Sequence, residues 1–218
     1  MAFGLIIIST ILVTFMLYNN QVYGHDFLLN LRFSLFQMVS AITTTGLQTA
    51  FYPDILSKWI GLGTFLMTII MIIGAGSLST GGSIKWLRVG ILLNGISWQV
   101  KSFILPGKAV MAKKLHHVTE LMITDDVIRL TGAFLSTYLV VYIVSVIIVL
   151  IYYPDISRVI FEVASALSNV GLSSGIMTPD SPVLVKIVFI VDFWMGRLEI
   201  WPVLLLIAIT INNVVRKR

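Results

Sequence analysis

The chain contains Phe36-Gln-Met-Val-Ser-Ala-Ile-Thr-Thr-Thr-Gly-Leu47 and, 125 positions later, Phe161-Glu-Val-Ala-Ser-Ala-Leu-Ser-Asn-Val-Gly-Leu172. The two stretches align without a gap, and their Phe, Ser, Ala, Gly and Leu residues are identical. Each is compatible with a short helix that ends in small hydroxyl residues and one glycine, and each lies between long apolar segments. Because a membrane–pore-loop–membrane repeat has this layout, the duplication indicates an ion path.

The composition is typical of an integral membrane protein. Of the 218 residues, 57% are hydrophobic and only 11% are charged, and the mean hydropathy is +0.97. Soluble domains carry about 25% charged residues, and an apolar helix of about 20 residues crosses a bilayer. These values predict an all-α polytopic membrane protein and exclude a single soluble core. The absence of cysteine excludes a disulfide framework, thiol catalysis and a thiolate metal site.

Two repeats and a polar linker account for the chain. We expect one membrane–pore-loop–membrane repeat over residues 1–97, a cytoplasmic linker over 98–130 and a second repeat over 131–218. Both pore helices should be re-entrant because they are too short to span, and the second helix of the first repeat should be broken. Asp155 is a candidate cap for the second pore helix. The apolar pattern predicts helices over Phe3–Tyr18, Phe27–Ala41, Trp59–Ile73, Ile84–Ser97, Thr131–Ile151, Ser157–Leu167 and, without interruption, Pro182–Ile211.

The distribution of basic residues predicts the orientation in the plasma membrane. Lysine and arginine gather in the linker, and Arg216-Lys-Arg218 closes the sequence. Under the positive-inside rule the linker and the C-terminus face the cytoplasm, so both pore loops enter from the outer face. This topology explains the net charge of +5 better than nucleic-acid binding does. His116-His117 is interpreted as a solvated linker pair rather than a metal site or pH sensor.

A cation filter needs oxygens, usually backbone carbonyls, in place of the water around a dehydrated ion. Carbonyls turn inward only where the backbone takes unusual dihedral angles, which glycine tolerates, and Gly46 and Gly171 meet that need. Thr43–Thr45 and Ser168 add hydroxyl oxygens, and each preceding helix would direct its negative C-terminal end at the ion. The alternative is an ordinary turn between two half-helices, which the matched duplication disfavours.

Four motifs carry a resemblance to a known family. In chain order they are Ile42-Thr-Thr-Thr-Gly-Leu47, Gly76-Ser-Leu-Ser-Thr-Gly-Gly-Ser-Ile-Lys85, Ser168-Asn-Val-Gly-Leu-Ser-Ser174 and Gly196-Arg-Leu-Glu199. Together they resemble the last two of four repeats in the Trk/Ktr/HKT superfamily of potassium transporters, and the resemblance covers essentially the whole chain. In that family one glycine per repeat lines the filter, and four repeats surround one pore. The resemblance implies that potassium is the only metal ion bound and that this chain binds no cofactor. It also implies half of a potassium filter, formed by Thr43, Thr44, Thr45, Gly46, Ser168, Asn169, Val170 and Gly171.

The segment between Gly74 and Gly82 consists of small residues, with Leu78 as the exception. Non-helical backbone at membrane depth survives only where protein or a wet cavity satisfies it, so a flexible break below the filter is a natural gate. By resemblance, this is the intramembrane loop that obstructs the family's pore. Close helix packing through small residues stays open as an alternative, whereas a phosphate-binding loop would need a lysine at position 82. The expected gate comprises Gly74, Ala75, Gly76, Ser77, Leu78, Ser79, Thr80, Gly81 and Gly82.

Arg197 lies midway along the expected helix Pro182–Ile211 and therefore near the bilayer centre. No neighbour one turn away can neutralise it, and an unpaired intramembrane arginine costs at least roughly 2.5 kcal/mol, so it should face water, a pore or a distant carboxylate. The resemblance implies that it points into the pore below the filter as an electrostatic barrier. The alternatives are a salt bridge to Glu199 of a neighbour or to Glu162, and a role for Asp192 and Glu199 in holding Arg197.

Glu162 occupies the position that Gln37 has in the other pore helix. It either adds negative potential near the filter or accepts buried hydrogen bonds from the loop backbone. The sequence leaves both interpretations open.

The presence of only two repeats departs from the family. We expect the C-terminal half of a longer protein, a split subunit, or a chain that pairs with a second copy of itself, and the start inside an apolar run favours the first. The resemblance implies a homodimer of complete pores in the lipid bilayer. It also implies a cytoplasmic nucleotide-binding RCK-type gating subunit, with contact points around 99–119 and 216–218.

The predicted function is potassium translocation across the cell membrane, without enzyme chemistry. One alternative is a two-pore-loop potassium channel that works as a homodimer. It would show Thr-x-Gly-Tyr/Phe-Gly in both loops, whereas each loop here has a single glycine. The other alternative is a non-conducting structural or regulatory membrane subunit. Potassium against sodium selectivity, and channel against coupled transport, stay open.

Overall fold

The computed structural model describes residues 2–49, 59, 61–74, 76, 79–104, 114–117, 119–122 and 124–216. Within these ranges the protein is helical apart from a short strand, β1 (Val22–His25), and an antiparallel hairpin of β2 (Lys114–His117) and β3 (Thr119–Met122). The all-α prediction is therefore confirmed in its essentials. The helices are α1 (Ala2–Asn19), α2 (Phe27–Ile42), α4 (Leu62–Ile73), α5 (Trp86–Ile104), α6 (Asp125–Leu150), α7 (Ile156–Leu167), α8 (Val183–Leu198) and α9 (Ile200–Arg216).

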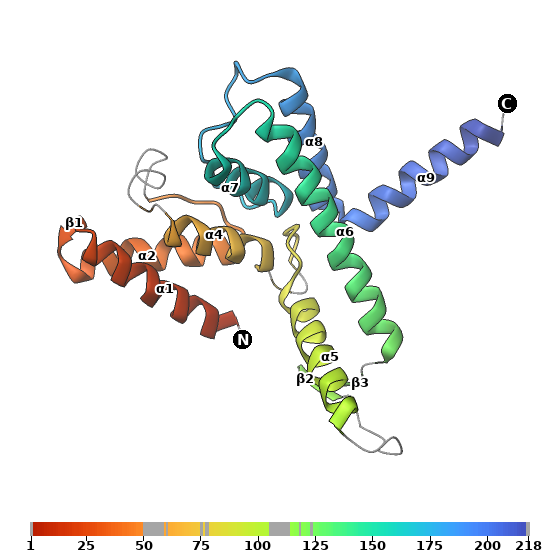
Figure 1. Ribbon diagram of the computed structural model, residues 1–218, viewed down its shortest axis with the longest axis horizontal. Coiled ribbons are helices and arrows are strands. Elements are labelled where there is room, and N and C mark those ends of the chain that lie inside the picture. Colours follow the sequence, from red (N-terminus) through yellow and green to blue (C-terminus); the bar gives the residue numbers. More distant parts are fainter. Residues whose placement is uncertain are drawn as a thin grey trace.

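Most of the helices fall into two groups that follow the two sequence repeats, whereas α5 of the first repeat packs against α6 of the second (Figure 1). In the first group α1 packs on α2 and α4, and in the second α6 packs on α7 and α8. The groups meet where α4 packs against α7, and the largest apolar core, which includes Met38, Met67 and Phe161, joins α2, α4 and α7. Both pore helices are thus held between two other helices of their own repeat, and α7 also contacts the preceding repeat.

Aspartate caps determine where the two pore helices begin. The backbone N–H groups of Leu28 and Leu29 donate to Asp26 Oδ1 at 3.0 and 3.2 Å, and the N–H of Arg158 donates to Asp155 Oδ1 at 3.3 Å. Such caps satisfy helix N–H groups that have no partner within the helix. The capping role predicted for Asp155 is confirmed.

The last inner helix is broken, contrary to the prediction of one helix over Pro182–Ile211. α8 ends at Leu198 and α9 begins at Ile200, because Glu199 takes φ 65° and ψ 150°, outside the helical region. Pro202 supplies the physical reason, since it lacks an N–H group and its ring collides with the carbonyl four residues earlier, that of Leu198. In Figure 1, α9 projects away from the body of the molecule.

The expected linker is shorter than predicted within the described residues. α5 continues to Ile104 rather than Ser97, and α6 begins at Asp125 rather than Thr131, so both helices extend into 98–130. By length and composition, the α6 region, Asp125–Tyr152, is the one described helix that could cross a membrane unaided. The apolar helices α1, α2, α4 and α9 are shorter. For α2 this agrees with the expectation of a re-entrant pore helix, and for α4 with that of a broken inner helix.

Candidate ion path

The two segments predicted to form the filter share the same positive-φ positions. We call residues 43–47 arm 1 and residues 168–172 arm 2. Thr44 and Asn169 both have φ 55°, and Gly46 and Gly171 have φ 74° and 95°. Each arm follows directly on the C-terminus of its pore helix, which ends at Ile42 or Leu167. The sequence repeat is therefore also a repeat of an unusual main-chain conformation.

The hydrogen bonds at the start of each arm repeat in the same way. Thr45 N–H donates to the carbonyl of Ser40 at 3.0 Å, and Val170 N–H donates to the carbonyl of Ser165 at 2.9 Å. These bonds turn the chain back over the last helical turn and leave the following glycine in a left-handed conformation, which glycine adopts without steric cost. The expectation that Gly46 and Gly171 take unusual dihedral angles is confirmed.

Each arm is also supported by a side chain from its pore helix. Gln37 Oε1 accepts the N–H of Thr49 at 3.2 Å, and Glu162 accepts the N–H of Ser174 at the equivalent position. Glu162 Oε1 also accepts the hydroxyl of Ser173 at 2.8 Å. Gln37 and Glu162 are both buried. The buried hydrogen-bonding interpretation of Glu162 is therefore the one that the structure bears out, and Gln37 has the same role, which the sequence analysis did not assign.

The two arms lie side by side. A Cβ atom built on Gly46 would collide with the carbonyl oxygen of Val170 and would lie 3.2 Å from Cα of Gly171. Beyond the arms, Gln48 Nε2 donates to the carbonyl of Ser173 at 3.4 Å. Gly46 is thus needed both for its dihedral angles and for the close approach of arm 2.

The hydroxyl groups of the arms have partners within the protein. Thr43 Oγ1 donates to the carbonyl of Val39 and lies 2.7 Å from Thr45 Oγ1, and Thr44 Oγ1 donates to the carbonyl of Thr43. Ser168 is completely buried, and its Oγ is 2.9 Å from the hydroxyl of Tyr138 on α6. Tyr138 thus holds the Ser168 hydroxyl in the core, and the place of Ser168 in an ion filter stays a prediction.

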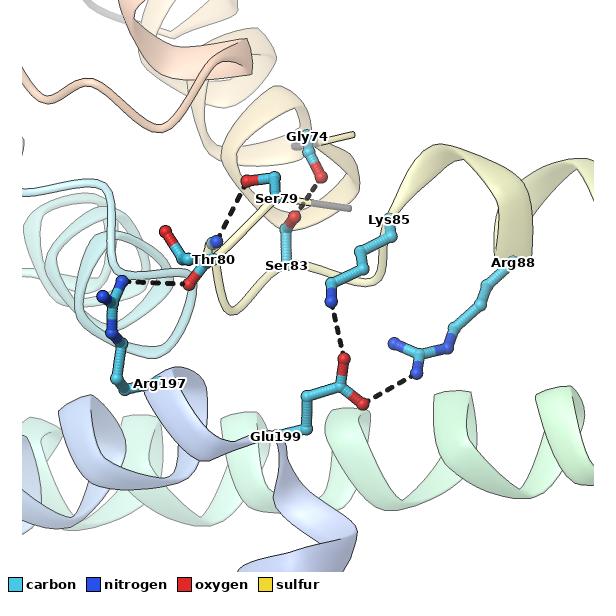
Figure 2. A network of polar contacts seen from close by, with 9 residues as sticks. Gly74, Ser79, Thr80, Ser83, Lys85, Arg88, Arg197 and Glu199 are labelled. Atoms are coloured by element: carbon cyan, nitrogen blue, oxygen red, sulfur yellow. Dashed lines mark hydrogen bonds and ion pairs between the residues drawn. The ribbon is translucent and has the colours of Figure 1, made fainter. Parts of the chain in front are cut away.

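The break predicted at 74–82 is present. α4 ends at Ile73, α5 starts at Trp86, and the described residues between them, Gly74, Gly76 and 79–85, are non-helical. Ala75, Ser77 and Leu78, also predicted as gate residues, lie outside the described residues. The Ser83 hydroxyl donates to the carbonyl of Gly74 and so ties the two ends of the loop together (Figure 2). Within the loop, Gly81 N–H donates to Ser79 Oγ at 3.0 Å.

The loop reaches arm 2 and α8 through glycine. Gly82 N–H donates to the carbonyl of Ser168 at 3.0 Å, and a Cβ on Gly82 would lie 2.6 Å from Cα of Gly196. Gly196 in turn lies against the carbonyl of Leu167 at the end of α7, as Gly74 lies against that of Ile42 at the end of α2. The break and close packing through small residues thus occur together, because close approach at these glycines places the loop against arm 2.

Arg197 lies in the last turn of α8 beside the loop. Its Nη1 donates to the carbonyl of Thr80 at 3.3 Å, and its side chain is exposed in this chain (Figure 2). Among the described residues the expected carboxylate partners of Arg197 are engaged elsewhere. Glu199 binds Lys85 and Arg88 at 2.6 and 2.9 Å, and Asp192 Oδ1 accepts the hydroxyl of Ser145 at 2.7 Å. The structure therefore contradicts salt bridges from Arg197 to Glu199, Asp192 or Glu162 within this chain.

Comparison with known proteins places the chain in a family. The sequence model of the TrkH family, described as a cation transport protein, matches residues 4–215. The chain belongs to the TrkH family. It is 34% identical over 176 residues to an uncharacterized cation transporter of Methanocaldococcus jannaschii, covering 80% of this chain and 35% of that protein. It is 30% identical over 185 residues to the Trk system potassium uptake protein TrkH of Halomonas elongata, covering 84% of this chain and 37% of that protein.

The structural comparison agrees with the family assignment. The crystal structure of the potassium transporter TrkH from Vibrio parahaemolyticus superposes with a TM-score of 0.77 and 25% sequence identity, covering 94% of this chain and 43% of that chain. This chain thus spans well under half the length of these TrkH relatives. The superfamily resemblance drawn from the four motifs is confirmed, as is the membrane-transporter fold class.

Proposed function

We propose that this chain supplies two of the four repeats of a potassium pore, with arms 1 and 2 as half of the selectivity filter. The observation that carries the proposal is the matched backbone of the arms, with Thr44 and Asn169 at φ 55° and a left-handed glycine two residues later. In such a filter carbonyl oxygens replace the water around potassium, and the C-terminal ends of α2 and α7 add negative potential. The relatives named for potassium uptake support the choice of ion.

An uncovered face on α2 supports the four-repeat arrangement. A groove beside α2 and arm 1 is lined by Arg32, Leu35, Phe36, Val39, Ser40, Thr43, Thr45 and Leu47. Phe36 and Leu47 are 39% and 60% exposed, whereas their repeat equivalents Phe161 and Leu172 are 0% and 2% exposed. In the second repeat the equivalent face lies on α7. It is covered because α7 packs against α4 of the first repeat.

The repeat symmetry therefore supplies an occupant for the groove, a helix equivalent to α4 from another repeat. That helix comes either from two further repeats or from a second copy of this chain. Apolar surface of this kind is typical of an interface. The uncovered groove also argues against a non-conducting subunit. A helix equivalent to α4 in this groove would bring the arms of further repeats next to arms 1 and 2.

For the gate we propose the loop 74–82 together with Arg197. The bond from Gly82 to Ser168 and the bond from Arg197 to Thr80 support a position directly below the filter. A cation that passes there meets the guanidinium charge, which acts as a barrier until the loop and Arg197 move apart. The assembly would lie in the plasma membrane as a homodimer of complete pores, with the region 98–130 and the C-terminus in the cytoplasm. An RCK-type gating subunit would bind near 99–119 and 216–218.

The experiment is rubidium or potassium uptake by potassium-uptake-deficient cells that express the complete pore containing this chain. Gly46→Ala should reduce uptake to background, because the added Cβ collides with the carbonyl of Val170 and disfavours φ 74°. Gly132→Ala is the matched control, since a Cβ at Gly132 meets nothing within 4 Å. Normal uptake by Gly46→Ala would refute the filter, and growth with this chain alone would favour the homodimeric arrangement.

A further inference from the structure

Lys85 and Glu199 hold the same place in the two broken inner helices. Lys85 directly precedes α5, and Glu199 directly precedes α9. Both have left-handed backbone angles, φ 70° and φ 65°, which are uncommon for residues other than glycine. Residues in such conformations persist only where the surrounding structure holds them. α5 and α9 therefore each begin after a residue whose backbone conformation needs support from surrounding residues.

An ion pair between these two residues provides that support. Lys85 Nζ lies 2.6 Å from Glu199 Oε1, and Arg88 Nη2 lies 2.9 Å from Glu199 Oε2 (Figure 2). The side chains of Lys85 and Glu199 are 13% and 35% exposed, so water reaches the carboxylate and screens the pair in part. The Arg88 guanidinium also lies 3.9 Å from the centroid of the Phe134 ring on α6. Glu199 thereby joins the α8–α9 break to α5 and to the last residues of the loop.

The other described contacts from the loop exit, residues 79–85, to arm 2 and α8 are longer. Gly82 N–H donates to the carbonyl of Ser168 at 3.0 Å, and Arg197 donates to the carbonyl of Thr80 at 3.3 Å. A short pair between two ionised groups is stronger than a hydrogen bond to a neutral carbonyl. Ile84 also packs in the core with Leu167 and Met195, and its N–H donates to the carbonyl of Ile72 at 2.9 Å. Among the polar contacts from the loop exit to α8 and arm 2, the pair with Glu199 is the shortest.

We propose that Glu199 is a positioning residue that latches the gate closed. Its carboxylate, held by Lys85 and Arg88, keeps the loop exit beneath arm 2, and a movement of α9 that withdraws Glu199 releases the loop. The proposal rests on the proposed function of 74–82 as a gate. α9 projects from the body of the molecule, so a cytoplasmic partner that displaces it would act on the loop through Glu199 (Figure 1).

The first test measures rubidium flux through the complete pore in proteoliposomes without a gating partner. Glu199→Gln keeps the side-chain shape and removes the charge, so we expect basal flux to rise roughly tenfold, which corresponds to about 1.4 kcal/mol. Lys85→Met should change flux in the same direction. Asp180→Asn, which removes an acidic charge from an exposed outer residue, should leave it unchanged.

The second test keeps the proposal falsifiable if Glu199→Gln folds poorly. The chain has no cysteine, so Lys85→Cys combined with Glu199→Cys introduces a unique thiol pair in this chain. A cleavable bifunctional thiol reagent should return the raised flux of this variant to the wild-type level, and reduction should raise it again. The single cysteine variants should not respond.

Unchanged or lower flux in Glu199→Gln, or a cross-linked pair with raised flux, would overturn the latch while leaving the pore intact. A wild-type assembly that carries no rubidium would overturn the proposed function itself, and the latch with it.

Discussion

Removing the hydroxyl group of Tyr138 should weaken arm 2 without disturbing its packing. Tyr138 is completely buried on α6, and its hydroxyl lies 2.9 Å from Ser168 Oγ at the start of the arm. A buried hydrogen bond contributes about 0.5–1.5 kcal/mol net, and leaving a buried partner unsatisfied costs about 1–3 kcal/mol. In Tyr138→Phe, however, the Ser168 hydroxyl can turn to the carbonyl of Ala164, as Thr43 Oγ1 does with Val39 at the equivalent position. We therefore expect a loss of about 1 kcal/mol.

The assay combines stability with ion discrimination. A loss of about 1 kcal/mol should lower the thermal midpoint of the purified assembly by no more than roughly 2–4 °C, the shift for a domain of this chain's size. Because Ser168 also accepts the N–H of Gly82, its displacement should reduce rubidium-over-sodium discrimination several-fold. Tyr142→Phe is the matched control, since Tyr142 donates to the carbonyl of Ile160 at 2.9 Å, in α7 and away from the arm. Equal loss of discrimination in both variants, or none in Tyr138→Phe, would refute the reasoning.

Three further outcomes are expected. Glu162→Ala should reduce potassium uptake more than Gln37→Ala, because Glu162 accepts hydrogen bonds from Ser173 and Ser174 whereas the described bond to Gln37 comes from Thr49 alone; equal uptake would contradict this. Gly196→Ala places a Cβ against the carbonyl of Leu167 at the end of α7 and should lower potassium uptake by ten- to a hundredfold. Expression should stay normal, and Gly132→Ala is the control. Arg197→Gln should raise basal rubidium flux about tenfold whereas Arg197→Lys should not; a rise in both variants would exclude a charge barrier.

The pore helices could be predicted because their signals are local. The expected Phe27–Ala41 and Ser157–Leu167 correspond to Phe27–Ile42 and Ile156–Leu167. The aspartate before each helix caps it, and the glycine after it permits the left-handed turn, so the relevant interactions span only a few residues. The break after Ile73 has a local signal too, a run of small residues with four glycines.

The break at Glu199 was missed because apolar residues continue across it. Hydropathy does not separate one helix of 30 residues from two shorter ones, and Pro202 was the local signal that could have indicated the interruption. The partners of Glu199, Lys85 and Arg88, lie 114 and 111 positions away, so no local pattern pairs them. A separation of 30 positions likewise hid the bond between Tyr138 and Ser168.

The sequence by itself determined the membrane-protein class, the duplicated arms and the family, because composition, periodicity and short motifs carry those features. Only the tertiary structure decided what each polar side chain binds. It directed the Ser168 hydroxyl to Tyr138, Glu162 to the backbone after arm 2, and Glu199 to Lys85 and Arg88 rather than Arg197. The physical reason is that a buried polar group needs a partner with suitable geometry, and helix packing, not nearness in sequence, brings that partner within reach.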